Sequence, residues 1–225
     1  MTQPAPPFWH RPTLGHLRHA LILSAAVGVW FGLVYGGADW LTHQHSYRLR
    51  LHSDAELRVP FVPAAVIGYV SLYPLFIMAP FVLRSGRELR ALAVSLAVVI
   101  GVAGIGFLAF PADNVFPTPD ERGGWSPVVR FAKWVALDYN LAPSLHVAMG
   151  TLCAAVYSRQ APPIGRAALW LWAGVIGLST LLLHQHYVVD IVTGYLLAFV
   201  GVRWVYDRLL QTPPASPATN PEPSP

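Results

Sequence analysis

The sequence predicts an all-α protein built as a bundle of six transmembrane helices, and three observations lead to this fold class. Of its 225 residues, 54% are hydrophobic and only 12% are charged, whereas soluble domains carry about 25% charged residues. A transmembrane helix needs about 20 mostly apolar residues, and six apolar segments follow one another along the chain. Polar links separate them, so a single helical membrane domain fits better than soluble domains.

The six segments are expected to form the helices in chain order. They cover residues 20–41, 62–83, 91–110, 143–157, 169–183 and 187–205. The fourth and fifth are short for a full crossing, so we expect their polar ends to extend them. The domain prediction is therefore a flexible segment at 1–16, the membrane domain at 17–208, and a disordered tail at 209–225, because that tail is rich in proline and nearly uncharged.

Basic residues in the links favour one orientation. With the amino terminus inside, nine arginines lie inside, and six basic residues lie outside, which agrees with the rule that cytoplasmic links are richer in Lys and Arg. The sequence thus predicts a multi-pass protein, assigned here to the plasma membrane, with both termini in the cytoplasm. The polar ends of the fourth and sixth segments then face outside.

The link between the third and fourth segments is expected to carry a helix of its own. It contains "SPVVRFAKWVALDY", residues 126–139, with apolar residues at helical spacing and a basic side. This pattern is typical of an interfacial helix that lies on the membrane surface. A loop helix packed on the domain fits the pattern equally well.

Composition also bears on partners. Cys153 is the only cysteine, so no internal disulfide can form. The net charge of +4 comes from dispersed residues, whereas a nucleic-acid-binding protein usually shows a clustered basic face. We therefore expect a lipid bilayer, and no nucleic acid, as the partner.

A first polar cluster opens the fourth segment, in "YNLAPSLHVA". Pro143 suits the first turn of a helix, where its missing N–H costs nothing. The early N–H groups of a helix have no internal partner and can bind an anion such as phosphate. Ser144 would add a hydroxyl donor, and His146 a proton that moves near neutral pH.

A second polar cluster, "STLLLHQHYVVD", spans residues 179–190. His186 and Asp190 are four residues apart, so on a helix they share one face. The carboxylate can then accept the Nδ1 proton and leave Nε2 free to attack. A carboxylate near an apolar region is costly and usually functional. His184, His186 and Asp190 could instead bind a metal, although no closed ligand set is apparent.

Taken together, "PSLH" and the pattern S-T-x5-H-x3-D resemble two motifs of the type 2 phosphatidic acid phosphatase and haloperoxidase superfamily, in its membrane branch. The PSLH form followed by "HYVVD" is most similar to the subgroup that contains the inositol phosphorylceramide synthases. The resemblance covers the carboxyl-terminal half, while the first three helices match only in number and hydrophobicity.

The resemblance implies a role for each matching residue. His186 would be the nucleophile that forms a phosphohistidine, and Asp190 would orient it. His146 would protonate the departing alkoxide and then activate water or an alcohol. The phosphate-binding set would be Ser144, the Leu145 backbone, Ser179 and Thr180. The resemblance implies no metal and no cofactor.

The sequence departs from the family pattern at three places. Leu145 replaces the usual glycine, and Thr180 replaces a phosphate-binding arginine. The first family motif, Lys, six residues, Arg-Pro, is absent. Because phosphoryl transfer needs charge stabilisation on the equatorial oxygens, another cation must act. His184 and Arg122 are the candidates.

The sequence therefore predicts a lipid-phosphate phosphatase that works through a phosphohistidine and acts on a membrane lipid. One alternative is a lipid phosphotransferase, in which an alcohol replaces water. A second alternative is a non-catalytic polytopic membrane protein with a degenerate site, favoured by the missing arginine. Arg130 and Lys133 are reserve candidates for the phosphate contact.

Overall fold

The computed structural model describes residues 7–117, 127, 130, 137 and 139–211, and within them the protein is all helical, with no strand. The helices are α1 (Leu14–His43), α2 (Val66–Val70), α3 (Leu72–Val82), α4 (Gly86–Ala109), α6 (Leu145–Ser158), α7 (Pro163–Leu182), α8 (Val188–Val200) and α9 (Asp207–Gln211), with 3-10 turns at Glu56–Arg58 and Pro63–Ala65 and a π-helical turn at Gly201–Tyr206. The all-α prediction is confirmed for this part of the chain.

Five helical stretches of the described chain are long and apolar enough to cross a membrane. They are Leu14–His43, Pro63–Val82, Gly86–Ala109, Pro163–Leu182 and Val188–Gln211. The sixth apolar helix, α6, has only 14 residues, or about 21 Å at 1.5 Å per residue, against a hydrocarbon core of about 30 Å. The protein is a multi-pass membrane protein, and a full crossing by α6 remains a prediction. The interfacial helix was placed at residues that lie almost entirely outside the described part.

Local sequence signals set where the helices begin and break. The Thr13 side chain accepts the His16 N–H and starts α1 at Leu14, inside the stretch 1–16 that was assigned to a flexible segment. Ser85 and Glu88 form a capping box at the start of α4. The second span breaks at Ser71, whose hydroxyl donates to the Gly68 carbonyl at 2.6 Å.

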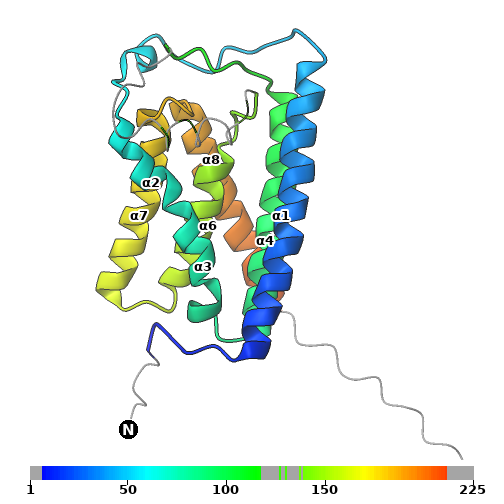
Figure 1. Ribbon diagram of the computed structural model, residues 1–225, viewed down its shortest axis with the longest axis vertical. Coiled ribbons are helices and arrows are strands. Elements are labelled where there is room, and N and C mark those ends of the chain that lie inside the picture. The colour runs from blue at the N-terminus through cyan, green and yellow to red at the C-terminus, as the bar shows by residue number, and fades with distance from the viewer. Residues whose placement is uncertain (1–6, 118–126, 128–129, 131–136, 138, 212–225) are drawn as a thin grey trace, which may run out of the picture.

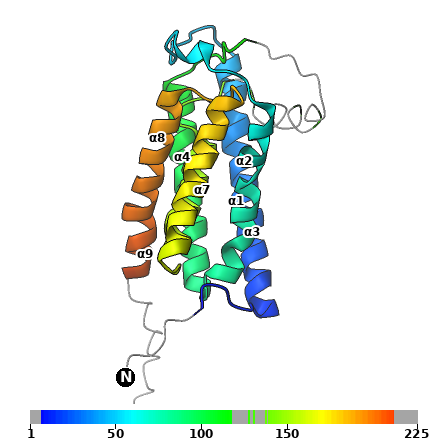
Figure 2. The same ribbon diagram turned by 90° about the vertical axis from the view of Figure 1, so that its left-hand side faces the viewer.

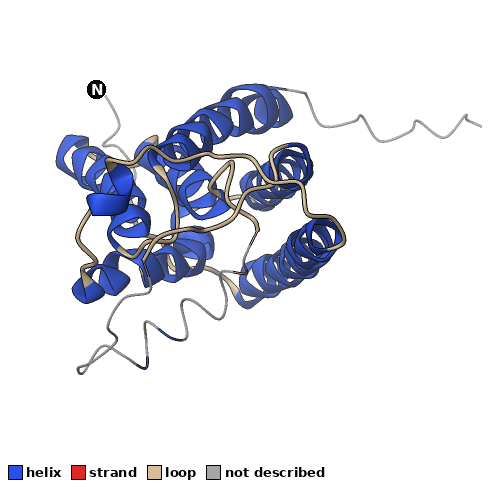
Figure 3. Ribbon diagram, turned by 90° about the horizontal axis from the view of Figure 1, so that it is seen from above, coloured by secondary structure: helices blue, strands red, loops and turns tan. Residues whose placement is uncertain are grey.

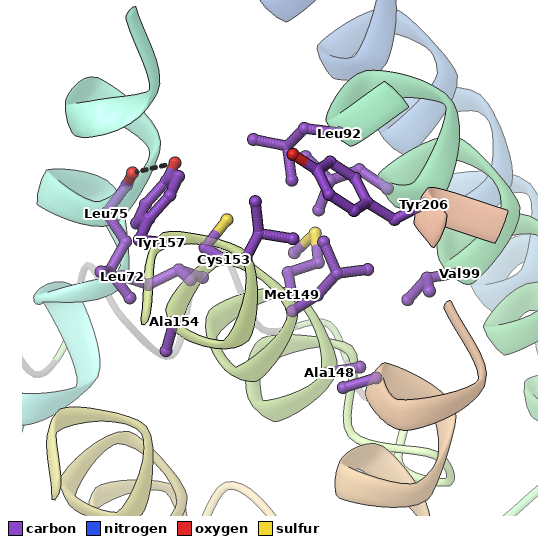
Figure 4. Packing of buried hydrophobic residues seen from close by; sticks show 14 of the residues in the cluster. Leu72, Leu75, Leu92, Val99, Ala148, Met149, Cys153, Ala154, Tyr157 and Tyr206 are labelled. Atoms are coloured by element: carbon purple, nitrogen blue, oxygen red, sulfur yellow. Dashed lines mark hydrogen bonds between the residues drawn. The ribbon is translucent and has the colours of Figure 1, made fainter. Parts of the chain in front are cut away.

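The short helix α6 lies between the other helices in Figure 1, and α7, which it contacts, stands at the front in the side view of Figure 2. Helix α6 contacts α7, α8, α3 and α4, whereas α1 packs mainly along α4 at the edge. Figure 4 shows α6 side chains such as Met149 and Cys153 surrounded by residues of neighbouring helices, including Leu72 and Leu92. Both Met149 and Cys153 are buried. The core of the protein is therefore built around α6.

The two ends of the bundle differ. At the upper end in Figure 1, the links 44–62 and 110–117 run over the helix ends, as Figure 3 shows from above. The α7–α8 connection and the start of α6 lie at this same end. At the lower end, residues 7–13 run below the bundle and the His10 N–H donates to the Phe81 carbonyl at 3.0 Å. Both predicted polar clusters therefore belong to the upper end.

Candidate functional site

His186 and Asp190 face each other at the start of α8, but not as two residues of one helix. The helix begins at Val188, so His186 precedes it, and Asp190 reaches back from the first turn. The Asp190 carboxylate is fully buried and its Oδ2 accepts the Tyr187 N–H at 2.8 Å. The same Oδ2 lies 3.6 Å from Nδ1 of His186, which is an ion-pair distance and longer than a hydrogen bond. Nδ1 thus faces the carboxylate, as the spacing predicted.

A backbone hydrogen bond joins the two polar clusters. The N–H of Ser144 donates to the carbonyl of Asp190 at 2.9 Å. Ser144 is fully buried and caps α6, where its Oγ accepts the Val147 N–H at 3.4 Å. The peptide bond between Ala142 and Pro143 is cis. The amino end of α6, called its head below, is therefore hydrogen-bonded directly to the first turn of α8.

Two glycines allow this close packing. A Cβ added to Gly194 of α8 would lie 2.6 Å from the Ser144 carbonyl oxygen, and one added to Gly106 of α4 would lie 2.5 Å from Cδ of Pro143. Real Cβ atoms do not approach other atoms so closely, so any side chain would push the head of α6 away. Glycine at these positions lets α4 and α8 pack against the PSLH segment.

His146 is fixed by a residue that the sequence analysis missed. Its Nε2 lies 2.7 Å from the backbone carbonyl of Tyr69, and its ring stacks on the Tyr69 ring with centroids 3.9 Å apart. A carbonyl oxygen only accepts, so Nε2 carries the proton of this hydrogen bond. Nδ1 is then the nitrogen that can give or take a proton in chemistry. No sequence signal marks Tyr69, because it comes from another helix.

His146 and His186 line one apolar cavity of about 270 Å³. Its other walls come from α1, α2, α3, α4 and α6, and most of the lining residues are hydrophobic. Among the described residues that line it there is no lysine or arginine. Asn140, also missed from the sequence, lines the cavity and donates from Nδ2 to the Tyr35 carbonyl at 2.7 Å. Two histidines at the end of a long apolar cavity suit a ligand with a polar head and a hydrocarbon chain.

The upper links hold the segment that carries His186. Glu56 accepts the Val188 N–H at 2.6 Å through Oε1, and the Val62 N–H donates to the Leu182 carbonyl at 2.9 Å. Partial burial acts to raise the pKa of Glu56, but N–H donors from Val188 and Ser53 outweigh it and hold the pKa below its ordinary value. An ionised carboxylate is therefore favoured at the amino end of α8.

His184 lies in the α7–α8 connection with its ring engaged in packing. Its Nε2 lies 2.9 Å from the Val59 carbonyl, its ring stacks on Phe116 with centroids 4.4 Å apart, and its φ is 55°. Within the described chain, Nδ1 of His184 is buried and has no hydrogen-bond partner. His184 is not among the described residues that line the cavity.

The remaining predicted phosphate contacts are placed as follows. The hydroxyls of Ser179 and Thr180 donate to carbonyls one turn back in α7, those of Ile176 and Gly177. Leu145 is buried and lines the cavity. Arg130 is exposed. Arg122 and Lys133 lie outside the described residues. The structure thus brings together Ser144, Leu145, His146, His186 and Asp190. Leu145, His146 and His186 line the cavity, whereas Ser144 and Asp190 are fully buried behind its lining. The Ser179 and Thr180 hydroxyls do not line the cavity either.

Metal binding by His184, His186 and Asp190 was an open alternative. In residues 7–117 and 139–211, no group of three or more His, Cys, Asp or Glu side chains lies in an arrangement that could hold a metal ion. The His184 ring instead bonds to Val59 and stacks on Phe116.

Comparison with known proteins gives one family. No curated protein matches the chain. The model of the PAP2 superfamily matches residues 38–204, which is well over half of the chain and includes both polar clusters. The chain belongs to the PAP2 superfamily.

Proposed function

We propose that the protein is a membrane phosphatase that hydrolyses the phosphate headgroup of a lipid through a phosphohistidine intermediate. Membership of the PAP2 superfamily supports phosphatase or phosphotransferase chemistry on lipid phosphates. The observation that carries the narrower proposal is that His146 and His186, from segments 40 residues apart, line the same apolar cavity. A lipid substrate would place its phosphate between the histidines and its hydrocarbon chain along the apolar walls.

In the first step, Nε2 of His186 attacks the phosphorus atom, and the bond between phosphorus and the lipid oxygen breaks. Asp190 holds Nδ1 of the same ring, which keeps Nε2 unprotonated and stabilises the positive charge that the ring gains. This step requires the separation of 3.6 Å to shorten to a hydrogen bond, as catalytic hydrogen bonds often do in the reacting complex.

His146 handles the proton. Since Nε2 donates to the Tyr69 carbonyl, Nδ1 is the atom that protonates the departing lipid alkoxide. In the second step the same Nδ1 takes a proton from water, whose oxygen attacks the phosphohistidine and releases inorganic phosphate. His186 then returns to its starting state.

The phosphate oxygens need donors in both steps. The Leu145 N–H stands at the amino end of α6, where the early N–H groups of a helix favour an anion. The Ser144 hydroxyl, which accepts the Val147 N–H, would have to turn toward the phosphate to donate to it. We propose Ser179, Thr180 and His184 as further contacts, which would require their present hydrogen bonds to rearrange. Arg122 remains the proposed source of fixed positive charge.

The proposal is tested by phosphate release from a panel of lipid phosphates by the purified protein. The panel includes phosphatidate, a polyprenyl diphosphate, a phosphosphingolipid and phosphatidylglycerol phosphate, each with and without inositol. Release of phosphate in the absence of inositol supports the phosphatase. Transfer of the headgroup to inositol identifies the phosphotransferase instead. Turnover of no lipid under either condition would favour the non-catalytic alternative.

We further propose that the upper end faces outside the cell and that both termini are cytoplasmic. In a Cys153→Ala background, an impermeant thiol reagent added to whole cells should label Ala55→Cys in the upper link. It should not label Ser85→Cys in the link between α3 and α4 at the lower end, although both positions are exposed. The reverse pattern would move the site to the cytoplasmic face.

A further inference from the structure

The cavity runs from the two histidines toward the lower end of the bundle. Along α1 its lining residues extend from Tyr35 to Ala20, and along α6 from His146 to Tyr157. These pairs are fifteen and eleven residues apart, so at 1.5 Å per residue the cavity is about 16–22 Å long. This depth is shorter than the hydrocarbon core of a bilayer, which is about 30 Å thick.

The lower end of the cavity is formed by one residue from each of four helices. The lowest lining residues are Ala20 of α1, Ala79 of α3, Leu89 of α4 and Tyr157 of α6. Tyr157 is fully buried and its hydroxyl donates to the Leu75 carbonyl at 2.9 Å, as Figure 4 shows. In this ring, Leu89 and Tyr157 are large buried side chains, and the two alanines are small and leave space in the cavity.

Residues 7–13 cover the bundle below this ring. Phe8 packs against the hydrophobic core. His10 and His16 both donate from Nε2 to the Leu83 carbonyl, at 3.0 and 2.9 Å, and Leu83 is fully buried. The cavity is also open at its side, where the lining residues Ser24, Gly28 and Tyr73 are exposed. A hydrocarbon chain that follows the cavity from the histidines meets packed side chains at the lower end.

We infer that this lower end limits the length of the hydrocarbon chain that the site accepts, and that Ala20 and Ala79 determine this specificity. The inference rests on the proposed function, because it assumes that the phosphate lies between His146 and His186. Each methylene of a ligand that can no longer be buried in an apolar site weakens binding roughly fourfold. A larger side chain at Ala20 or Ala79 would occupy the space of the last methylenes and affect long chains alone.

The test uses n-alkyl monophosphates from butyl to octadecyl, assayed with wild type, Ala20→Phe and Ala79→Phe in the same detergent. The quantity to compare is kcat/KM of each variant divided by that of wild type, so that partitioning into detergent cancels. Beyond a certain chain length this ratio should fall by roughly fourfold for each displaced methylene. Ala26→Phe is the matched control, because Ala26 is an exposed residue of α1 outside the cavity lining, and its ratio should stay flat.

Leu89→Ala tests the same inference in the opposite direction. It removes bulk from the ring, so its ratio to wild type should rise with chain length. This variant also keeps the inference testable if the phenylalanine variants do not fold. The inference is overturned if the ratio to wild type is independent of chain length both in Leu89→Ala and in a phenylalanine variant, Ala79→Phe or Ala20→Phe.

Failure of the proposed function gives a different result. If wild type releases no phosphate from any substrate, binding is followed with n-alkyl phosphonates, through the shift they cause in the thermal unfolding midpoint. If the longest phosphonate that still raises the unfolding midpoint is shorter for Ala79→Phe than for wild type, the cavity inference is supported without the catalytic one. A shift that depends on chain length identically in all variants would contradict the inference.

Discussion

Helices α1 and α6 are both apolar, yet they have opposite surroundings. Of the 30 residues of α1, only Ala20, Ala38 and Thr42 are buried, and the helix lies at the edge of the bundle along α4 (Figure 1). In α6, 12 of 14 residues are buried. Large side chains such as Leu21 and Leu33 of α1 face outward, where lipid would surround them.

The comparison shows that hydropathy reports an apolar surrounding without saying whether lipid or protein provides it. Lipid cannot satisfy polar groups, so lipid-facing helices must be apolar. The surroundings of α6 are protein, which supplies the Tyr69 carbonyl to His146 and the Asp190 carbonyl to Ser144. The polar head of α6 is tolerated for this reason, and His146 of the candidate site lies on a helix that is surrounded by protein.

The largest contrast is expected between histidines of the two helices. His146→Ala at the head of α6 should lower kcat by about 100- to 10,000-fold, the usual range for loss of a general acid or base. His43→Ala at the end of α1 removes an exposed contact to the Tyr139 hydroxyl and should change kcat less than about threefold, within the small effect of a surface substitution. Steady-state kinetics on one lipid phosphate measure both. Equal effects would show that His146 has no part in the chemistry.

A smaller contrast is expected between two glycines. Gly194→Ala would place a Cβ 2.6 Å from the Ser144 carbonyl oxygen, so overpacking should destabilise the fold by about 1–3 kcal/mol. Gly32→Ala in α1 meets no atom within 4 Å and should stabilise the helix by about 0.5–1 kcal/mol. Thermal unfolding in detergent measures the two shifts, which should have opposite signs. Stabilisation by Gly194→Ala would refute the close packing of α8 on the PSLH segment.

The smallest effect is expected at Glu56, which bonds the upper link to α8. Its folded pKa lies below the ordinary value of 4.5, so its stabilising contribution is present above that value and is lost as pH falls through the folded pKa. Glu56→Gln keeps an acceptor for the Val188 N–H but does not titrate. Wild type should unfold at a higher temperature than the variant at pH 7, and the difference should shrink as the pH falls below 4.5 and through the folded pKa. A difference that does not change from pH 7 down to the lowest pH at which both proteins stay folded would contradict this account.

Much of the fold could be predicted from hydropathy, and the errors have local causes. The fourth predicted segment, 143–157, comes close to α6 at Leu145–Ser158, because Ser144 is a strong cap signal. Pro143 precedes this cap and does not lie in the first turn, where the sequence analysis predicted it. The first helix begins at Leu14 and not near residue 20, because polar residues such as His16 and Arg18 hide a helix start that Thr13 caps. The apolar stretch begins after these polar residues, but the helix already includes them.

The site could be predicted only where its geometry follows from local spacing. The i to i+4 relation of His186 and Asp190 brings Nδ1 within 3.6 Å of the carboxylate, although His186 precedes α8 and is not on the same helix. The expected hydrogen bond between them stays a prediction. His184 was chosen for its nearness in sequence, which does not determine ring direction, and Val59 holds its Nε2. Tyr69 and Glu56 contact the site from segments more than 70 residues away, and no pattern within those segments predicts the contact.

The central claim is that His186 carries the phosphoryl group during turnover. Wild type and the His186→Ala and His146→Ala variants are incubated with a substrate labelled with ³²P in its phosphate, quenched in denaturant at alkaline pH, and assayed for protein-bound label that acid releases. The account predicts acid-labile label on wild type and on His146→Ala, and none on His186→Ala. Label that persists in the His186→Ala protein would show that another residue is the nucleophile and would contradict the account.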